Sequence, residues 1–196
     1  RYIAVTGVQT CALPIWTENC AAFWTFFYGR IIQRLRPYLS FDTPIVELGS
    51  GWGRNLFKFL EMEICSRVIG GEFTEEGVKL ARSIAAKYEL PADFFPFDYR
   101  LPAEGFLERL KDTVIFTHNS VEQVNYLPEE TIRSLARSAP RAVVHFEPVY
   151  EYREKNTLRH LLWKRYTEVN DYNRNVLTLL KKLESECYLK IVREEP

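Results

Sequence analysis

Residues 44–55 read PIVELGSGWGRN, and this stretch decides the fold. An apolar run that favours a β-strand passes into three glycines at every second position, Gly49, Gly51 and Gly53. An apolar pattern with helical spacing restarts over residues 56–60, so the order is strand, tight turn, helix. Glycine lets a ligand lie against the turn, and the free N–H groups of the following helix attract an anionic group. The stretch therefore predicts a site for a nucleoside-bearing cofactor.

The spacing of the glycines separates two classes of cofactor. A dinucleotide-binding turn has glycine at the sixth position of G-x-G-x-x-G, where this chain has Arg54. The pattern here is G-x-G-x-G, and ELGSGWGRN resembles the first motif of the class I S-adenosylmethionine-dependent methyltransferases. In that family the turn passes under the methionine part of the cofactor. The resemblance implies cofactor contacts from Glu47, Gly49, Ser50, Gly51, Gly53 and Asn55.

A second part of the resemblance is a short apolar strand that ends in the acid Glu72. This acid lies 23 residues after Gly49, near the offset of about 20 residues that is typical of a ribose-binding acid. A carboxylate accepts two hydrogen bonds from a ribose diol, so the resemblance implies that Glu72 holds the ribose and that Phe73 packs on the adenine. The alternative is a surface glutamate that opens the next helix, where acids suit the helix dipole.

A third part is the aromatic strand at residues 93–97, which is followed by Asp98. The resemblance implies that Asp98 accepts a hydrogen bond from the adenine amino group and that Phe97 and Tyr99 form walls of the adenine pocket. The alternative is an aspartate that initiates a turn.

The binding site for the methyl acceptor is expected where the fourth and fifth strands end. By resemblance the tip of the strand at residues 113–117, with Thr117 and His118, faces the sulfonium and the methyl acceptor. An oxygen acceptor needs a base, and His118 is the first candidate because histidine titrates near neutral pH. Glu122 or Glu147 would orient His118 or act in its place. The alternative for His118 is a structural, hydrogen-bonded histidine.

Two features concern the ends of the chain. Residues 5–15, VTGVQTCALPI, resemble one reading frame of a common sequencing-adapter oligonucleotide, so residues 1–15 are interpreted as non-native and excluded from fold reasoning. Residues 16–43 are expected to form an N-terminal helix, and residues 44–196 the cofactor-binding domain. The family's sheet ends with an antiparallel strand for which no sequence remains after residue 192. We therefore expect a truncated chain with an unpaired sheet edge.

Apolar runs alternate with helical patterns along the chain. This alternation predicts a Rossmann-like α/β three-layer sandwich, with a mostly parallel sheet and helices on both faces. Strands are expected at residues 45–48, 67–73, 93–97, 113–117, 142–146 and 188–192. Helices are expected at residues 17–39, 54–63, 75–88, 103–110, 129–138, 158–166 and 172–186.

Composition narrows the class of function. The 196 residues suit one domain, and 26 basic against 26 acidic residues give a formal net charge of zero. This balance gives no support to a nucleic-acid or membrane-surface partner, and no apolar run has the length of a membrane span. The four cysteines show neither metal-ligand spacing nor a disulfide framework, so we expect no metal and a reducing, cytoplasmic compartment.

The sequence thus predicts S-adenosylmethionine-dependent methyl transfer to a small-molecule acceptor. The fourth strand ends in THNS rather than in an N-P-P-Y-type amino-methylating motif, which favours an oxygen or carbon acceptor over a nitrogen acceptor. One alternative is an NAD-linked oxidoreductase, which requires glycine in place of Arg54. The other is a cofactor-binding module without activity. The sequence carries no signal for oligomeric state.

Overall fold

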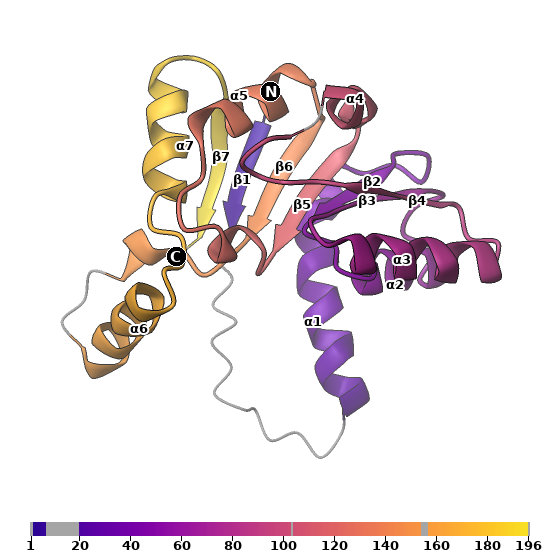
Figure 1. Ribbon diagram of the computed structural model, residues 1–196, viewed down its shortest axis with the longest axis horizontal. Helices are drawn as coiled ribbons and strands as arrows, with labels where there is room; N and C mark the ends of the chain where they lie inside the picture. The colour runs from indigo at the N-terminus through magenta and orange to yellow at the C-terminus, as the bar shows by residue number, and fades with distance from the viewer. Residues whose placement is uncertain (1, 7–19, 103, 154–156, 196) are drawn as a thin grey trace.

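The strands of the chain form one parallel sheet. The computed structural model describes residues 2–6, 20–102, 104–153 and 157–195. Within them a seven-stranded sheet has the order β4-β3-β2-β5-β6-β1-β7, and every pairing is parallel (Figure 1). The strands are β1 (Tyr2–Thr6), β2 (Ile45–Leu48), β3 (Val68–Glu72), β4 (Ala92–Pro96), β5 (Val114–His118), β6 (Ala142–Phe146) and β7 (Lys190–Glu195). The predicted Rossmann-like α/β class is confirmed.

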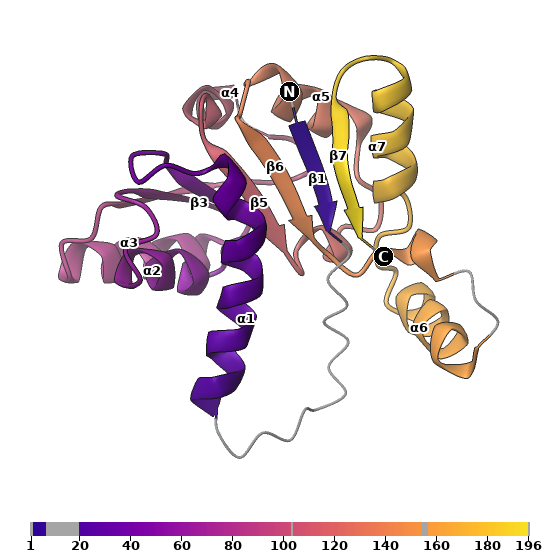
Figure 2. The ribbon, with the colours of Figure 1, turned by 180° about the vertical axis from the view of Figure 1, so that it is seen from behind.

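Helices cover both faces of this sheet. The α-helices are α1 (Cys20–Leu35), α2 (Arg54–Glu61), α3 (Glu75–Lys87), α4 (Glu104–Leu107), α5 (Glu129–Arg137), α6 (Leu158–Val169) and α7 (Val176–Ser185). Short 3₁₀ helices are η1 (Arg36–Tyr38), η2 (Glu108–Leu110), η3 (Val121–Gln123) and η4 (Tyr150–Tyr152). Helices α1, α2 and α3 pack on one face, and α4, α5 and α7 on the other. Helix α6 and the N-terminal half of α1 lie on the side to which the strand arrows point (Figures 1 and 2).

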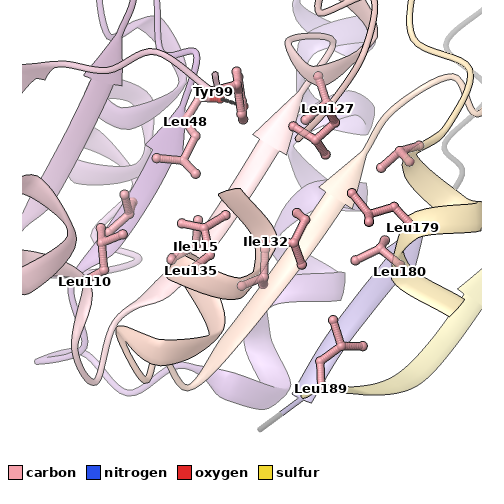
Figure 3. Packing of buried hydrophobic residues seen from close by; sticks show 14 of the residues in the cluster. Leu48, Tyr99, Leu110, Ile115, Leu127, Ile132, Leu135, Leu179, Leu180 and Leu189 are labelled. Carbon is pink, nitrogen blue, oxygen red and sulfur yellow. Dashed lines mark hydrogen bonds between the residues drawn. The ribbon is translucent and has the colours of Figure 1, made fainter. Parts of the chain in front are cut away.

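Two hydrophobic clusters, one on each face, hold the layers together. Figure 3 shows the cluster under α5 and α7, which contains Ile115 of β5, Ile132 of α5 and Leu180 of α7. On the opposite face Phe59 of α2 packs on Phe116 of β5, with ring centroids 5.5 Å apart. Fully burying a large apolar side chain contributes about 1.5–3 kcal/mol. Because β5 is covered on both sides, it is a continuous apolar run, which is why the sequence predicts it well.

The flank of the sheet differs from the expected arrangement. The short strand β1 lies between β6 and β7 and pairs in parallel with both, so that Tyr2 is opposite Ala142 and Lys190. Residues 2–6, which belong to the segment interpreted as non-native, therefore form a strand of the sheet. The described strands include no antiparallel partner, and β7 is the last strand at this edge of the sheet, with β1 as its neighbour. The adapter interpretation of residues 5–15 stays a prediction, and residues 7–15 lie outside the described part of the chain.

Several element boundaries also differ. Helix α7 was expected from Tyr172, but it begins at Val176. The reason is Asn173, whose Oδ1 accepts the N–H groups of Asn175 at 3.1 Å and Val176 at 3.0 Å. Its Nδ2 donates to the main-chain O of Val124 at 2.9 Å, which fixes a loop where the sequence suggested a first helical turn. Strand β7 begins and ends later than expected, and helix α1 is followed by η1, which contains Pro37.

Candidate functional site

A cavity of about 670 Å³ lies where β2, β3, β4 and β5 end. Ligands of open parallel sheets bind beyond the carboxyl ends of the strands, and the volume is in the range of small-molecule sites. The residues predicted as cofactor contacts that line the cavity are Gly49, Gly51, Glu72, Phe73, Phe97 and Asp98. Its other lining residues are Thr74, Tyr99, Arg100, Asn119, Ser120, Gln123, Val124, Asn125, Asn170 and Asp171.

The glycine turn forms one wall of the cavity. Gly49 has a φ of +77°, and its N–H donates to the main-chain O of Gly71 at 2.7 Å. A Cβ built on Gly49 would lie 2.3 Å from the Cβ of Ser120, which leaves no room for a side chain. Gly51 also has a positive φ, but a Cβ there would meet nothing within 4 Å. The turn therefore needs glycine at position 49 for its own packing, whereas position 51 keeps space open on the cavity side.

A chain of contacts behind the turn ties it to α1. Glu47 Oε1 accepts a hydrogen bond of 2.6 Å from Asn55 Nδ2, and Asn55 Oδ1 accepts one of 3.3 Å from the Tyr28 hydroxyl. The guanidinium of Arg54 lies 3.6 Å from the ring centroid of Trp24. Helix α2 begins at Arg54 without a side-chain cap, so its first N–H groups are available to an anionic ligand.

Several residues predicted as cofactor contacts stand behind the cavity wall instead of on it. Glu47 and Asn55 hold the turn from below, and Ser50 is buried. Gly53 packs against the ring of Phe94, where a Cβ would lie only 2.6 Å from the ring. Thr117 is buried as well, and its hydroxyl pairs with His145 Nδ1 at 3.0 Å. The sequence identified the motif but not which side of the turn each residue occupies.

Buried carboxyl groups converge beneath the turn. Glu47 is 2% exposed, and burial raises its pKa to about 8 against the lowering effect of the Asn55 hydrogen bond. The carboxylates of Glu147 and Glu72 add to this rise. Burial also raises the pKa of Glu147, whose two oxygens accept the N–H groups of Ser120 and Glu122, each at 3.2 Å. Several strands thus contribute acids to one poorly solvated region.

Glu47→Gln should reduce the loss of folding stability at rising pH, to which Glu122 and Glu147 also contribute because burial raises their pKa values. The folded-state pKa of Glu47 is above the unfolded value of 4.5, so its contribution is complete below 4.5 and is lost as pH rises towards 8. The pKa values of His118 and His145 are lowered by burial from 6.5 to about 4, so their contributions are complete above 6.5. Between pH 6.5 and 8 we expect the wild type to lose about 2 kcal/mol through Glu47.

Urea denaturation at several pH values across this window measures the effect. The exposed Glu76→Gln serves as the matched control and should retain the wild-type slope. An unchanged slope in Glu47→Gln would show that another group carries the pH dependence.

Glu72 joins the glycine turn to the start of α3. Its Oε2 accepts the N–H of Gly51 at 2.9 Å, and its Oε1 accepts the N–H and hydroxyl of Thr74 at 2.9 and 2.7 Å. Glu72 is only 9% exposed, and Glu75 and Glu76 occupy the first turn of α3 instead. The carboxylate is therefore fixed at the carboxyl end of β3 on the cavity wall, and the surface-glutamate alternative does not describe it.

The predicted adenine end of the cavity contains Phe73, Asp98 and Arg100. Phe73 is 63% exposed, and the Arg100 guanidinium carbon lies 5.5 Å from its ring centroid. The same guanidinium and the N–H of Arg100 bind the carboxylate of Asp98, which lowers the pKa of Asp98. Tyr99 lines the cavity as predicted, and its hydroxyl lies 2.8 Å from both the main-chain O of Leu48 and Ser120 Oγ.

The three candidates for acid–base chemistry have different environments. His118 ends β5 and packs edge-on against Phe27, with ring centroids 4.9 Å apart, and burial lowers its pKa to about 4. Glu147 is fully buried and holds the η3 turn through main-chain N–H groups. Glu122 is half-buried, and burial together with the charge of Glu147 raises its pKa to about 7. None of the three lines the cavity, although Ser120 and Gln123 beside them do.

Residues from α6 and the loop after η3 complete the cavity and were not predicted. Asn125 Nδ2 donates to Asp171 Oδ2 at 3.1 Å, which joins this loop to the end of α6. Helix α6 buries Thr167 and leaves Leu158 and Leu162 exposed. No short motif marks Asn125 or Asp171, because their contact joins segments distant in the sequence. Arg100 had a local signal, since it follows Asp98 by two positions.

The described part of the chain contains neither a helix with the length and hydrophobicity to cross a membrane nor a group of three or more His, Cys, Asp and Glu residues placed to hold a metal ion.

Two solved structures that share the fold of this chain are described as methyltransferases. A protein from Bacillus halodurans C-125 that has been assigned as a methyltransferase matches 79% of this chain and 67% of its own length, with 12% identity and a TM-score of 0.56. The plantazolicin methyltransferase BpumL, solved with a pentazolic desmethylPZN analogue and S-adenosylhomocysteine (SAH), matches 86% of this chain and 66% of its own length, with 14% identity and a TM-score of 0.54. The chain therefore has the Rossmann-like fold of S-adenosylmethionine-dependent methyltransferases.

Other solved structures match a smaller part of this chain. YcgJ from Bacillus subtilis matches 58% of this chain with 19% identity and a TM-score of 0.46. This chain spans about half the length of several solved proteins that it matches, with 45% of YcgJ and 46% of the N-terminal domain of EvdMO1 covered. Scans against family models and curated proteins found no match.

Proposed function

We propose that this chain binds S-adenosylmethionine in the cavity and transfers its methyl group to a small-molecule oxygen acceptor. The observation that carries the proposal is the pairing of Gly51 with Glu72. The N–H of Gly51 fixes one oxygen of the carboxylate at 2.9 Å, while the absent side chain of Gly51 leaves the space in front of the turn open. A flat nucleoside fits this space, with its ribose against Glu72 and its adenine between Phe73 and Asp98.

The remaining cofactor contacts follow from the same placement. The amino-acid part of the cofactor lies along Gly49 and Gly51 towards the start of α2, where unpaired N–H groups and the helix dipole attract its carboxylate. Thr117 and His118 end β5 beside the turn, and we assign the transferred methyl group to this edge. BpumL, which shares the fold, was solved with SAH, and this supports the cofactor assignment.

The chemistry requires positioning and one proton transfer. The bound cofactor supplies a methyl group on a positively charged sulfur. Gly49, Gly51 and Glu72 would hold this cofactor, and the hydroxyl proton of the acceptor would pass to a base on the protein. We assign this base to Glu122, because a carboxylate with a pKa of about 7 removes a proton at neutral pH more effectively than a histidine with a pKa of about 4. His118 then shapes the part of the site where the methyl acceptor binds. Glu147 positions Glu122 by accepting a hydrogen bond from the main-chain N–H of Glu122.

Calorimetric titration of the chain with SAH and with NAD tests the cofactor assignment. We expect SAH to bind and NAD not to bind, because the third glycine of a dinucleotide turn is replaced by Arg54, which packs on Trp24. Binding of NAD without SAH would overturn the proposal and favour the oxidoreductase. The balance of 26 basic and 26 acidic residues supports a small-molecule acceptor over a nucleic acid.

Glu122→Gln should lower kcat about 10²-fold, the usual contribution of a general base. The affinity for SAH should stay unchanged, because Glu122 does not line the cavity. In the wild type the rate should rise as pH increases through about 7, where Glu122 loses its proton. Methyl transfer from labelled cofactor to a panel of phenols and other hydroxylated compounds, measured at several pH values, gives both results.

His118→Gln is the matched control for this experiment, and it should keep the rise near pH 7. A wild-type rate that is flat through pH 7, or full activity in Glu122→Gln, would remove Glu122 from the mechanism. Binding of SAH without turnover of any acceptor would favour the inactive-module alternative.

A further inference from the structure

Arg100 occupies the part of the cavity that the proposed function gives to adenine. Its Nε donates to Asp98 Oδ1 and its Nη2 to Asp98 Oδ2, both at 3.0 Å, so the guanidinium lies side-on against the carboxylate. The main-chain N–H of Arg100 also donates to Asp98 Oδ1 at 2.8 Å. The same guanidinium lies over the Phe73 ring, at 5.5 Å from its centroid. All three residues line the cavity.

These contacts are of the kind that an adenine ring would make. Adenine is flat and stacks on an aromatic face, and its exocyclic amino group donates to a carboxylate. The guanidinium of Arg100 is also flat, stacks on aromatic rings and donates to carboxylates through a pair of N–H groups. Oδ1 of Asp98 already accepts two hydrogen bonds, both from Arg100, and Oδ2 accepts a third. Arg100 therefore occupies the place beside Asp98 and over Phe73 that the adenine ring would need.

We propose that Arg100 is an internal competitor of the cofactor, which closes the adenine end of the cavity and must release Asp98 and Phe73 before adenine can bind. This inference rests on the proposed function, since it assumes that the nucleoside of S-adenosylmethionine occupies this end.

The exchange is energetically modest and readily reversible. The side chain of Arg100 is 58% exposed and that of Asp98 is 28% exposed. Ion pairs with this exposure are weak and are screened by salt. A released guanidinium is hydrated at the rim of the cavity, so no buried charge remains unpaired. Arg100 therefore sets the affinity for the cofactor without blocking the site permanently.

Arg100→Ala tests the competition by calorimetric titration with SAH. Removing the competitor should tighten SAH binding about two- to fivefold at low ionic strength. In the wild type the affinity should rise between about 0.01 M and about 1 M NaCl, because salt weakens the pair of Arg100 and Asp98. In Arg100→Ala this rise should be absent.

A matched control exists at the opposite end of the same strands. Arg67 pairs with Asp93, also an exposed arginine and aspartate, but this pair lies next to the amino ends of β3 and β4. Arg67→Ala removes the same charge and should leave both the affinity for SAH and its salt dependence at wild-type values. S-Inosylhomocysteine, which has a carbonyl group in place of the adenine amino group, is a second probe. The preference for SAH over this analogue should be larger in Arg100→Ala than in the wild type.

The outcomes separate the two proposals. If the wild type does not bind SAH, the proposed function fails. If the wild type binds SAH but Arg100→Ala binds it with equal or lower affinity, the proposed function stands and the competition is refuted. Lower affinity in the variant would make Arg100 a contact of the bound cofactor instead of its competitor.

Discussion

Gly49→Ala will lower the free energy of unfolding by about 3 kcal/mol and abolish SAH binding. Overpacking in a rigid site costs about 1–3 kcal/mol, and a left-handed backbone with a side chain costs about 1–2 kcal/mol more. The new Cβ would lie 2.3 Å from the Cβ of Ser120 and 2.8 Å from its Oγ. Ser120 cannot withdraw easily, because its hydroxyl donates to the main-chain O of Leu48 at 2.8 Å and its N–H is held by Glu147. The turn must therefore shift away from β5.

Two other glycines give this experiment its controls. Gly51→Ala has the backbone cost of about 1 kcal/mol but no steric clash, and its methyl group stands in the cavity. It should keep most of the stability and lose SAH affinity. Gly29→Ala, in an exposed position of α1 with nothing within 4 Å, should be neutral or stabilising by up to about 1 kcal/mol. Urea denaturation and calorimetry measure the three variants, and wild-type binding in Gly51→Ala would contradict the placement of the cofactor against the turn.

Glu72→Ala will raise the dissociation constant for SAH about 10³-fold. Hydrogen bonds to a charged group are worth about 1.5–3 kcal/mol each, and the proposed ribose contact contains two of them. The loss of the carboxylate also frees the N–H of Gly51 and the hydroxyl of Thr74, which loosens the turn. Glu72→Gln keeps the shape but presents an amide, so it should lie between the wild type and Glu72→Ala.

A cofactor analogue separates the lost ribose contact of Glu72→Ala from any change in the fold of the variant. SAH and its 2′-deoxy form are titrated into the same protein, so any change of fold affects both equally. The wild type should prefer SAH, and Glu72→Ala should bind the two compounds with equal, weak affinity. If Glu72→Ala retains the preference for the intact diol, another residue holds the ribose.

The sequence predicted the parts of the fold that depend on local pattern. Strand β6 has the predicted bounds, and β2 was placed correctly, because parallel strands buried on both faces are short apolar runs with clear ends. The glycine turn was recognised because its backbone requires particular residues at fixed spacing. These features are encoded within a few neighbouring positions.

Other features depend on contacts between distant segments and could not be predicted. The start of α7 is set by Asn173, which binds Val124 across the loop. Asn125 reaches Asp171 in the same way. The raised pKa of Glu47 results from burial beside acids of neighbouring strands, and no single strand shows this convergence. For Arg100 the sequence gave the position two residues after Asp98, but only the structure shows its place over Phe73.

The location of β1 has a consequence for how the chain reaches its native state. The backbone partners of Tyr2 are Ala142 and Lys190, which both lie far from it in the sequence. The pairs β2–β3 and β3–β4 join segments that are close in sequence and can form early. Closing the long loop between β1 and β7 is slow by comparison, so this side of the molecule completes last.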